Sequence, residues 1–256
     1  MSSDSAGHSD DQLHRHMLDL PVEATIFDFN GTLSDDEELL AELYTAIFDE
    51  HLGFDLETDE YYRSLAGLSD AEIVTSVLGW TGRGDDSRLA ARLLDEKIRR
   101  YKAEVRSHPR IAAEAVEFVV DVSRRVPVAV VTGAARAEVD AALDAAGLSE
   151  AVRFVIAGED VSRGKPDPEG YDMARRRLAP LEAARIVVFE DSMVGIRAAK
   201  AAGMQCIAVA GTTDRAMLAG ETRLLVDRIA TEQAGWFLDV LPDVTSSAPG
   251  PEPSAR

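Results

Sequence analysis

The sequence predicts an α/β protein: a doubly wound, Rossmann-like parallel sheet with an all-helical cap domain inserted into it. Short β-branched runs alternate with helical patterns over most of the chain, which is typical of a parallel sheet covered by helices. A long interval after the first run contains no convincing strand pattern. The 256 residues, 46% of them hydrophobic, suffice for about one to two domains with a substantial core.

Each expected strand is a short apolar run bounded by polar or turn residues. The runs are almost continuously apolar rather than alternating, which indicates strands buried on both faces of a sheet. The six runs are residues 24–29, 126–131, 154–157, 186–189, 206–209 and 224–226. Helical patterns rich in Ala, Leu and Arg lie between runs, for example at residues 135–146, 168–178 and 195–202. Strand and helix alternate, so the sheet should be parallel and doubly wound.

Residues 34–107 interrupt this alternation with helical patterns alone. Four segments carry apolar residues at helical spacing, and glycine-containing turns separate them. The four segments are residues 35–51, 57–66, 70–78 and 85–106. An insert of this size is long enough to be a small domain, hinged at two nearby crossings. We therefore expect a helical cap at residues 34–107 on a core formed by residues 21–33 and 108–240.

The two ends of the chain are polar and lack a hydrophobic period. Residues 1–20 are rich in Ser, Asp and His, and residues 241–256 are rich in Pro and Ser. His8, His14 and His16 lie close enough in sequence to suggest a metal site, but a disordered arm explains them better. We expect both ends to be disordered and to carry no chemistry.

The charge of the chain argues against several classes of partner. The formal net charge is −19, from 46 acidic and 27 basic residues, so nucleic acids and anionic membranes would be repelled. No apolar stretch approaches the roughly 20 residues that cross a bilayer, and the N-terminus lacks a signal-peptide pattern. The single cysteine, Cys206, cannot form an internal disulfide and lies in an apolar run that predicts burial. We expect a cytoplasmic monomer or homodimer that acts on a small molecule.

Chemically related groups follow four of the expected strands. Ligands of open parallel sheets bind at the carboxyl ends of the strands, so these residues should converge. The segments are Phe27-Asp28-Phe29-Asn30-Gly31-Thr32-Leu33, Val131-Thr132-Gly133-Ala134, Arg163-Gly164-Lys165-Pro166 and Glu190-Asp191-Ser192. Each segment alone is a weak signal, but together they supply the parts of a phosphoryl-transfer site.

Each of these residue types has a role in phosphoryl transfer. Asp28 would be the nucleophile, and Thr132 would donate its hydroxyl to a phosphate oxygen. Lys165 would neutralise charge, while Glu190 and Asp191 are the oxygen ligands that Mg²⁺ favours. The expected phosphate-binding residues are Gly31, Thr32, Thr132, Gly133, Ala134 and Lys165. Together these assignments predict a magnesium-dependent phosphoryl-transfer site.

Ordinary structural roles are open to the same residues. Asp28 could cap a turn, and Lys165 could be a surface lysine before a proline turn. Glu190 and Asp191 could cap the following helix, since acids suit the positive end of a helix. Capping is compatible with metal binding, and only the combination of segments favours catalysis.

The motifs resemble the haloacid dehalogenase superfamily, in the subgroup that contains β-phosphoglucomutase and related sugar-phosphate phosphatases. The resemblance covers roughly residues 22–230. It is carried by the strand-end segments and by residues 158–161, 164–168, 189–192, 195–196 and 201–203. It implies a phosphoaspartyl intermediate on Asp28. It also implies that Mg²⁺ is held by Asp28, the backbone carbonyl of Asn30 and Asp191, with Glu190 assisting.

Asn30 departs from the pattern of this superfamily. Phosphatases of the superfamily carry at this position an Asp that protonates the leaving oxygen and later deprotonates the attacking water. An amide can do neither, so an acid-base contribution of roughly 10² to 10⁴ in rate should be missing. The backbone contact with the metal would survive, so the resemblance still implies Asn30 as a metal ligand and as part of the catalytic set with Asp28 and Lys165.

Three outcomes follow from Asn30. In the outcome we favour, the enzyme uses substrates with good leaving groups or borrows an acid from the cap or its flanking loop. The candidate acids are Asp35, Asp36, Asp70 and Glu72. In the second outcome, the chain is a weak catalyst that binds or senses a phosphorylated metabolite. In the third, the labile pair Asn30-Gly31 deamidates and restores an Asp.

Other chemistries of the superfamily fit less well. Phosphonate-cleaving members place a lysine in the cap loop, and residues 65–70 contain none. The acidic pair Glu190 and Asp191 argues against dehalogenation. A phosphosugar mutase has a phosphate-binding Arg near the position of Asp70, where an acid would repel a second phosphate, so hydrolysis is favoured over the mutase alternative. Specificity should lie in the cap, where the candidate residues are Tyr61, Tyr62, Arg63 and the loop 67–70, although both tyrosines would also suit the core.

Overall fold

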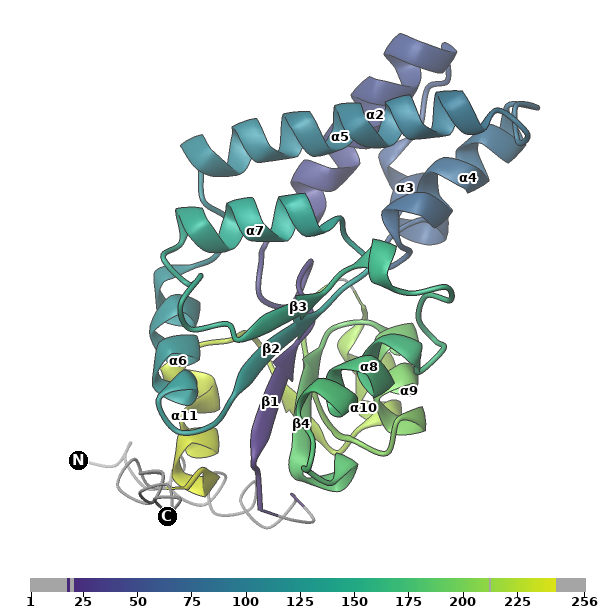
Figure 1. Ribbon diagram of the computed structural model, residues 1–256. Coiled ribbons are helices and arrows are strands. Elements are labelled where there is room, and N and C mark those ends of the chain that lie inside the picture. Colours follow the sequence, from purple (N-terminus) through teal and green to yellow (C-terminus); the bar gives the residue numbers. More distant parts are fainter. Residues whose placement is uncertain (1–17, 19–20, 212, 243–256) are drawn as a thin grey trace, which may run out of the picture.

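A six-stranded parallel sheet in the order β3-β2-β1-β4-β5-β6 forms the centre of the computed structural model, which describes residues 18, 21–211 and 213–242 (Figure 1). The strands are β1 Ala24–Phe27, β2 Val128–Val131, β3 Phe154–Ile156, β4 Ile186–Glu190, β5 Gln205–Val209 and β6 Leu224–Val226. Each overlaps one of the six predicted runs, so the α/β, doubly wound fold is confirmed. β1 is two residues shorter than its run because the chain turns after Asp28, where three successive amides, from Thr32 to Ser34, donate to the carbonyl of Phe29.

Helices cover both faces of the sheet. One face packs on α6 Ala113–Ser123 and α11 Thr231–Val240, and the other on α8 Glu169–Arg177, α9 Met193–Ala201 and α10 Arg215–Glu221. Aromatic side chains fill the first interface: Phe27 stacks on Phe189 with ring centroids 5.0 Å apart, and Phe118 and Phe237 both meet Phe189 edge-on. Alternate strand residues thus supply two separate cores, as expected for strands buried on both faces.

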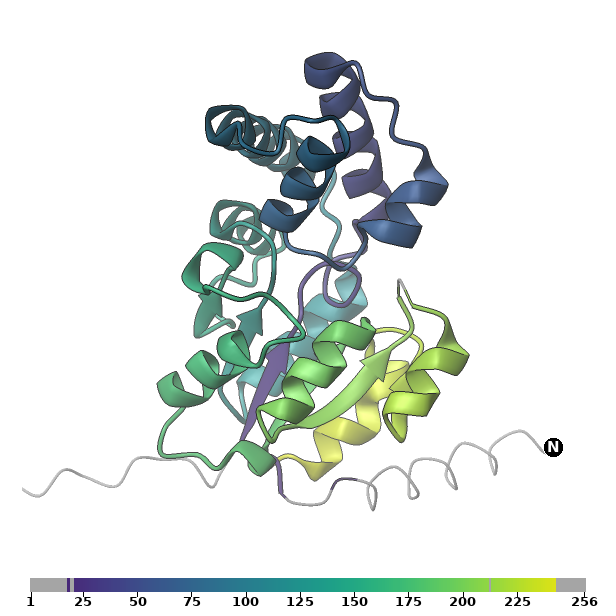
Figure 2. The same ribbon diagram turned by 90° about the vertical axis from the view of Figure 1, so that its right-hand side faces the viewer.

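The first four helices after β1 form a layer above the carboxyl end of the sheet (Figures 1 and 2). We call α2 to α5 the helical insert. Its helices are α2 Glu37–Leu52, α3 Thr58–Ser64, α4 Asp70–Trp80 and α5 Ser87–Ser107. The described residues of this segment contain no strand, which confirms the predicted helical character. The exact division at residues 34–107 stays a prediction.

The insert rests on α7 Arg136–Ala145 through a buried ionic group (Figure 1). Lys97 of α5 donates to Asp70 of α4 at 2.8 Å and to Glu138 of α7 at 2.5 Å. Tyr44 of α2 also donates to Asp70, at 2.6 Å, and the backbone amide of Ala135 donates to its other oxygen at 3.2 Å. We call Lys97, Asp70, Glu138 and Tyr44 the Lys97 cluster. It connects three helices of the insert with one helix of the core.

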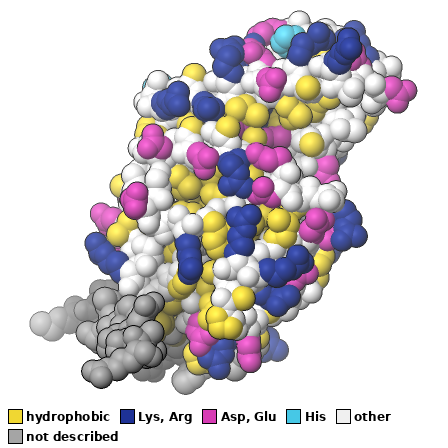
Figure 3. All heavy atoms as spheres, in the orientation of Figure 1, with side chains coloured by type: hydrophobic (Ala, Val, Ile, Leu, Met, Phe, Trp, Pro, Cys, Tyr) yellow, Lys and Arg dark blue, Asp and Glu magenta, His cyan; other side chains and the backbone are white. Residues whose placement is uncertain are grey.

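Several other predictions concern the surface and the ends of the chain. Cys206 is buried, as predicted. None of the helices in the described part of the chain is both long and apolar enough to cross a membrane. Lys and Arg side chains alternate with Asp and Glu on the face drawn in Figure 3, so the acidic excess forms no continuous patch there. The predicted disordered ends, including all three N-terminal histidines, lie almost wholly outside the described residues.

Candidate active site

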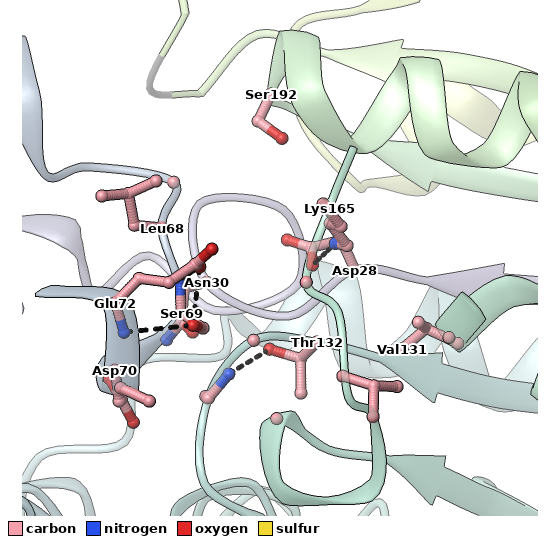
Figure 4. Close-up of a pocket in the computed structure, with 18 of the residues that line it drawn as sticks. Asp28, Asn30, Leu68, Ser69, Asp70, Glu72, Val131, Thr132, Lys165 and Ser192 are labelled. Carbon is pink, nitrogen blue, oxygen red and sulfur yellow. Dashed lines mark hydrogen bonds and ion pairs between the residues drawn. The ribbon is translucent and has the colours of Figure 1, made fainter. Parts of the chain in front are cut away.

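The four strand-end segments converge beneath the helical insert at a cavity of about 500 Å³ (Figure 4). Register explains the convergence, because β1 pairs with both β2 and β4 and places Phe27 beside Val130 and Phe189. The core residues lining the cavity include Asp28, Asn30, Thr132, Gly133, Ala134, Lys165 and Asp191. From the insert, Glu37, Tyr61 and the loop around Ser69 line the opposite wall. Figure 4 shows the Lys165 and Asp28 side chains meeting, with Leu68 and Glu72 across the cavity.

Lys165 bridges two carboxylates that follow neighbouring strands. Its ammonium donates to Oδ1 of Asp28 and, at 2.5 Å, to Oε1 of Glu190. Burial alone would lower the pKa of Lys165, but the carboxylates of Asp28 and Glu190 outweigh it and raise that pKa. Burial raises the pKa of Asp28, Lys165 opposes the rise, and the charges of Glu190 and Asp191 add to it. The site therefore carries more negative charge than its one lysine can balance.

Glu190 lies behind the cavity wall rather than on it. It is fully buried, and its Oε2 accepts from the backbone amide and the hydroxyl of Ser192, both at 2.9 Å. A β-carbon on Gly195 would lie 1.6 Å from Oε1 of Glu190, so only glycine leaves room for this carboxylate. Ser192 also caps α9 by accepting from the amide of Gly195 at 3.0 Å. The capping and acidic roles that the sequence left open therefore coexist.

The donor set fits a divalent cation. Asp28, Glu190 and Asp191 each offer a carboxylate oxygen, and these oxygens lie within 4.8 Å of one another. Thr32 donates its hydroxyl to Oδ1 of Asp191 at 3.0 Å, which holds that carboxylate in place. Hard oxygen ligands with excess negative charge are the environment that Mg²⁺ prefers. Thr32, predicted as a phosphate-binding residue, does not line the cavity and orients Asp191 instead.

The other predicted phosphate-binding residues occupy two places. Thr132, Gly133 and Ala134 line the cavity, and Oγ1 of Thr132 accepts from the amide of Ala134 at 3.0 Å. Gly31 does not line the cavity; its φ of 75° lets the chain turn sharply after Asn30. A β-carbon on Gly133 would lie 3.0 Å from Cα of Ser69, so the insert lies directly on the end of β2.

Asn30 is held by an acid of the following loop. Its amide nitrogen donates to Oδ2 of Asp36 at 3.0 Å, and the same oxygen accepts from Ser34 at 2.7 Å and from Tyr101 at 2.5 Å. Asp36 is fully buried, and burial raises its pKa against the effect of these hydrogen bonds. The amide at position 30 is therefore a donor that pairs with a buried carboxylate.

The acids that the sequence suggested as substitutes for the missing Asp are poorly placed. Asp35 is exposed, and neither it nor Asp36 lines the cavity. Asp70 lines the cavity, but its Oδ1 accepts hydrogen bonds from Tyr44 and Lys97 and its Oδ2 accepts one from a backbone amide. Glu72 forms a capping box with Ser69 at the start of α4. These contacts argue against all four candidates.

The sequence reasoning missed Glu37, the first residue of α2. Glu37 lines the cavity, and its Oε2 accepts from the hydroxyl of Tyr61 at 3.1 Å. Its position at the first helix turn after the Asp28 loop was the available signal. Tyr61 also lines the cavity, whereas Tyr62 and Arg63 do not, and Arg63 pairs with Glu60 instead.

The match to a family model agrees with this fold and site. The model described as haloacid dehalogenase-like hydrolase matches residues 25–209, which is more than half of the chain. The chain therefore belongs to the haloacid dehalogenase-like hydrolases, as its motifs predicted.

Two relatives and one solved structure are similar to the chain over most of its length. The chain is 33% identical to validoxylamine A 7'-phosphate phosphatase of Streptomyces hygroscopicus subsp. limoneus, over 79% of this chain and 92% of that protein. It is 31% identical to a phosphorylated carbohydrates phosphatase of Thermotoga maritima, over 73% of this chain and 84% of that protein. The crystal structure of CbbY from Rhodobacter sphaeroides in complex with phosphate is similar, with a TM-score of 0.71 and 29% identity, over 82% of this chain and 95% of that chain.

Proposed function

We propose that this protein is a phosphatase that hydrolyses a small phosphorylated metabolite through a phosphoaspartyl intermediate on Asp28, with Mg²⁺ as cofactor. The observation that carries the proposal is the placement of Asp28 directly after β1, with the ammonium of Lys165 on its Oδ1 and with carboxylate oxygens of Asp28, Glu190 and Asp191 within 4.8 Å of one another. The names of the relatives support the reaction class, because two of them are phosphatases of phosphorylated carbohydrates or related compounds.

The side chains of the site divide the reaction between them. Asp28 attacks phosphorus in line with the leaving oxygen, and water later hydrolyses the resulting acyl phosphate. Lys165 neutralises charge on the nucleophile and on the transferring phosphoryl group, and Thr132 with the amides after β2 positions its oxygens. Asp28, Asp191 and the backbone carbonyl of Asn30 would hold Mg²⁺, with Glu190 assisting. When bound, the metal supplies further stabilisation of negative charge on the phosphoryl oxygens.

The cavity favours a substrate with one phosphate. Its volume of about 500 Å³ lies in the range of small-molecule sites. Lys165 and Arg163 are the cationic side chains among the described lining residues, and Arg163 already pairs with Asp167 at 2.9 Å. A second phosphate would therefore find little positive charge, which favours hydrolysis over phosphoryl transfer between two positions of a sugar.

Phosphate release tests the proposal. The purified full chain is assayed in saturating Mg²⁺ with p-nitrophenyl phosphate, acetyl phosphate and a panel of sugar phosphates. We expect Mg²⁺-dependent turnover by the wild type, and Asp28→Asn should reduce it by roughly 10⁴-fold or more. Multiple turnovers with any donor support the enzyme over the alternative of a binding or sensing protein. Absence of turnover with every donor, or full activity of Asp28→Asn, would refute the proposal.

A further inference from the structure

The proposed reaction needs a group that can give and take a proton, and Asn30 cannot. Stage one of the reaction leaves an alkoxide that must be protonated, and stage two needs a base for the attacking water. The carboxyl groups among the described lining residues belong to Asp28, Glu37, Asp70, Glu72, Asp167 and Asp191. Asp28 is the nucleophile and Asp191 a proposed metal ligand.

Three of the remaining four are engaged elsewhere. Asp70 belongs to the Lys97 cluster. Glu72 is exposed to solvent, and its Oε2 accepts from both the amide and the hydroxyl of Ser69, at 2.9 and 2.6 Å. Asp167 pairs with Arg163 and also accepts from the amide of Glu169 at 3.0 Å. Among the described lining residues, Glu37 is the remaining carboxyl group, and it is less exposed to solvent than Glu72.

Glu37 has the geometry of a positioned acid. Its Oε2 accepts one hydrogen bond, from Tyr61, and no hydrogen bond to Oε1 is found within the described part of the chain. Tyr61 is itself fixed, because it is 1% exposed and stacks on Tyr44 with ring centroids 6.3 Å apart. One oxygen of Glu37 is therefore oriented by a rigid partner, and the other is available to a ligand in the cavity.

The link between Asn30 and Asp36 fixes Glu37 relative to the nucleophile. Asp36 is the residue immediately before Glu37, and it binds the side chain of Asn30, two residues after Asp28. This hydrogen bond ties the start of α2 to the loop that carries Asp28. Asn30, which replaces the expected acid, thus anchors through Asp36 the helix turn that carries Glu37.

We propose that Glu37 is the general acid and base of this site, in place of the side chain at position 30. This inference rests on the proposed phosphatase function. In the first stage, the protonated Glu37 gives its proton to the leaving oxygen as the phosphorus–oxygen bond breaks and Asp28 bonds to phosphorus. In the second, the Glu37 carboxylate takes a proton from the water that attacks phosphorus. Inorganic phosphate leaves, Asp28 regains its carboxylate, and Glu37 is again protonated.

The surroundings of Glu37 suit both protonation states near neutral pH. Burial, together with the charges of Asp191 and Asp36, raises the pKa of Glu37 to about 7, against the opposing effects of the Tyr61 hydroxyl and of Lys97. A cation held by Asp191 would remove the contribution of that residue but leave burial, the largest cause. A pKa near the working pH is what a group that alternates between acid and base requires.

Glu37→Gln tests the proposal on the full chain with Mg²⁺. The leaving group of acetyl phosphate needs no acid. With this substrate we expect Asp28 to be phosphorylated normally, and the resulting phosphoaspartate to be hydrolysed slowly. The acid-stable, hydroxylamine-sensitive phosphoenzyme should therefore accumulate, and kcat should fall by roughly 10² to 10⁴. Glu38→Gln, which changes an exposed acid of the same helix turn, is the matched control and should behave as wild type. Melting curves check that both variants fold.

The pH profile separates acid-base catalysis from a structural role. The wild-type rate with acetyl phosphate should rise with pH as Glu37 ionises, and Glu37→Gln should lose this limb. Tyr61→Phe removes a hydrogen bond that lowers the pKa of Glu37, so its limb should move to higher pH. A triple variant adds Asn30→Asp and Asp36→Asn to Glu37→Gln, which places a carboxyl group at position 30. It should regain activity, because the pair at positions 30 and 36 still consists of one amide and one carboxylate.

The outcomes are distinct for this inference and for the proposed function. Inactive wild type, or activity in Asp28→Asn, overturns the phosphatase proposal and the inference with it. If wild type turns over through Asp28, two results overturn the inference alone: Glu37→Gln with wild-type kcat, or Glu37→Gln with a raised KM and unchanged kcat, which would make Glu37 a substrate-binding residue. Loss of kcat with accumulated phosphoenzyme and a lost pH limb supports it.

Discussion

Two lysines in the described part of the chain, Lys165 and Lys97, each bridge a pair of carboxyl groups, yet their surroundings differ. The side chain of Lys165 is 15% exposed at the wall of the cavity and contacts Asp28 and Glu190. The side chain of Lys97 is 0% exposed and lies between the helical insert and the core. Both groups hold more negative than positive charge, so each needs a further source of compensation.

The structure compensates the two groups in different ways. Around Lys165, the carboxylates of Asp28 and Asp191 line the cavity, and that of Glu190 lies behind its wall with an oxygen within 4.8 Å of theirs. In the Lys97 cluster, Asp70 lines the cavity, whereas the side chains of Lys97 and Glu138 are 0% exposed. Burial raises the pKa of Glu138 to about 8 even though Lys97 opposes the rise, which favours a proton there over a second negative charge. Oε1 of Glu138 is buried without a hydrogen-bond partner, consistent with a carboxyl group that prefers to be neutral. The group around Lys165 is therefore suited to binding ligands in the cavity, whereas the Lys97 cluster stabilises the contact between the helical insert and the core.

The largest effect on stability should come from Lys97→Met. The substitution leaves the buried carboxyl groups of Asp70 and Glu138 without their cation, so the free energy of unfolding should fall by roughly 3 to 5 kcal/mol. Urea unfolding followed by circular dichroism measures the loss. Lys102→Met on the same helix is the matched control and should change the value by no more than about 0.5 kcal/mol. Equal stability of the two variants would show that the Lys97 cluster does not hold the insert to the core.

Lys165→Met should act mainly on catalysis. Losing a cation that faces the transferring phosphoryl group should lower kcat by roughly 10² to 10³. Its cost in stability should be smaller than that of Lys97→Met, because Asp28 and Asp191 line the cavity, where water and Mg²⁺ would reach their carboxylates. Added Mg²⁺ should therefore restore part of the stability of Lys165→Met and none of that of Lys97→Met. The comparison fails if Mg²⁺ affects the unfolding of both variants alike.

Sequence patterns predicted the two groups unequally well. The strand-end residues were predictable because parallel strands bring their carboxyl ends to one edge, wherever they lie in the sequence. Lys97 had a readable signal as well, since it interrupts an apolar stripe of α5 at four-residue spacing, between Leu93 and Tyr101. Its partners could not be predicted, because Glu138 lies 41 residues away and meets it only through the docking of the insert.

The same limit applies to Asn30 and Glu37. The sequence showed that Asn30 lacks an acid function, but not that its amide binds Asp36. Asp36 was considered as a substitute acid, and the structure buries it under Tyr101, 65 residues along the chain. Glu37 was overlooked because its exposure to the cavity depends on the angle at which α2 leaves the loop. Local periodicity predicts elements, whereas contacts between elements set the chemistry of individual side chains.

Mg²⁺ binding should stabilise the wild type through the carboxylates around Lys165 and not through the Lys97 cluster. A ligand that binds only the folded state stabilises it by about 2.7 kcal/mol at a concentration of 100 Kd. We expect Mg²⁺ to raise the melting temperature of the wild type, and Asp191→Asn to lose most of this increase. Differential scanning fluorimetry with and without EDTA measures the shift. An unchanged increase in Asp191→Asn would place the cation elsewhere.

The pH dependence that Glu138 gives to stability tests the protonation of the Lys97 cluster directly. Its pKa is about 8 in the folded protein against an ordinary value of 4.5, so between these pH values the folded state keeps a proton that the unfolded state releases. Stability from this group therefore falls as the pH rises from about 4.5 to 8. Glu138→Gln cannot titrate, so the difference in unfolding free energy between variant and wild type should shift in favour of the variant as the pH rises.

Urea unfolding at pH 5, 7 and 9 measures this difference, with Glu117→Gln, an exposed acid of α6, as the control for general charge effects. If Glu138→Gln and Glu117→Gln show the same pH dependence, Glu138 is ionised throughout and the Lys97 cluster carries its excess charge unrelieved. If Glu138→Gln alone flattens the pH dependence of the unfolding free energy, a proton on Glu138 compensates the excess negative charge beside Lys97, as a metal ion would beside Lys165. The two clusters would then be alternative solutions to one electrostatic problem, separated by access to the solvent.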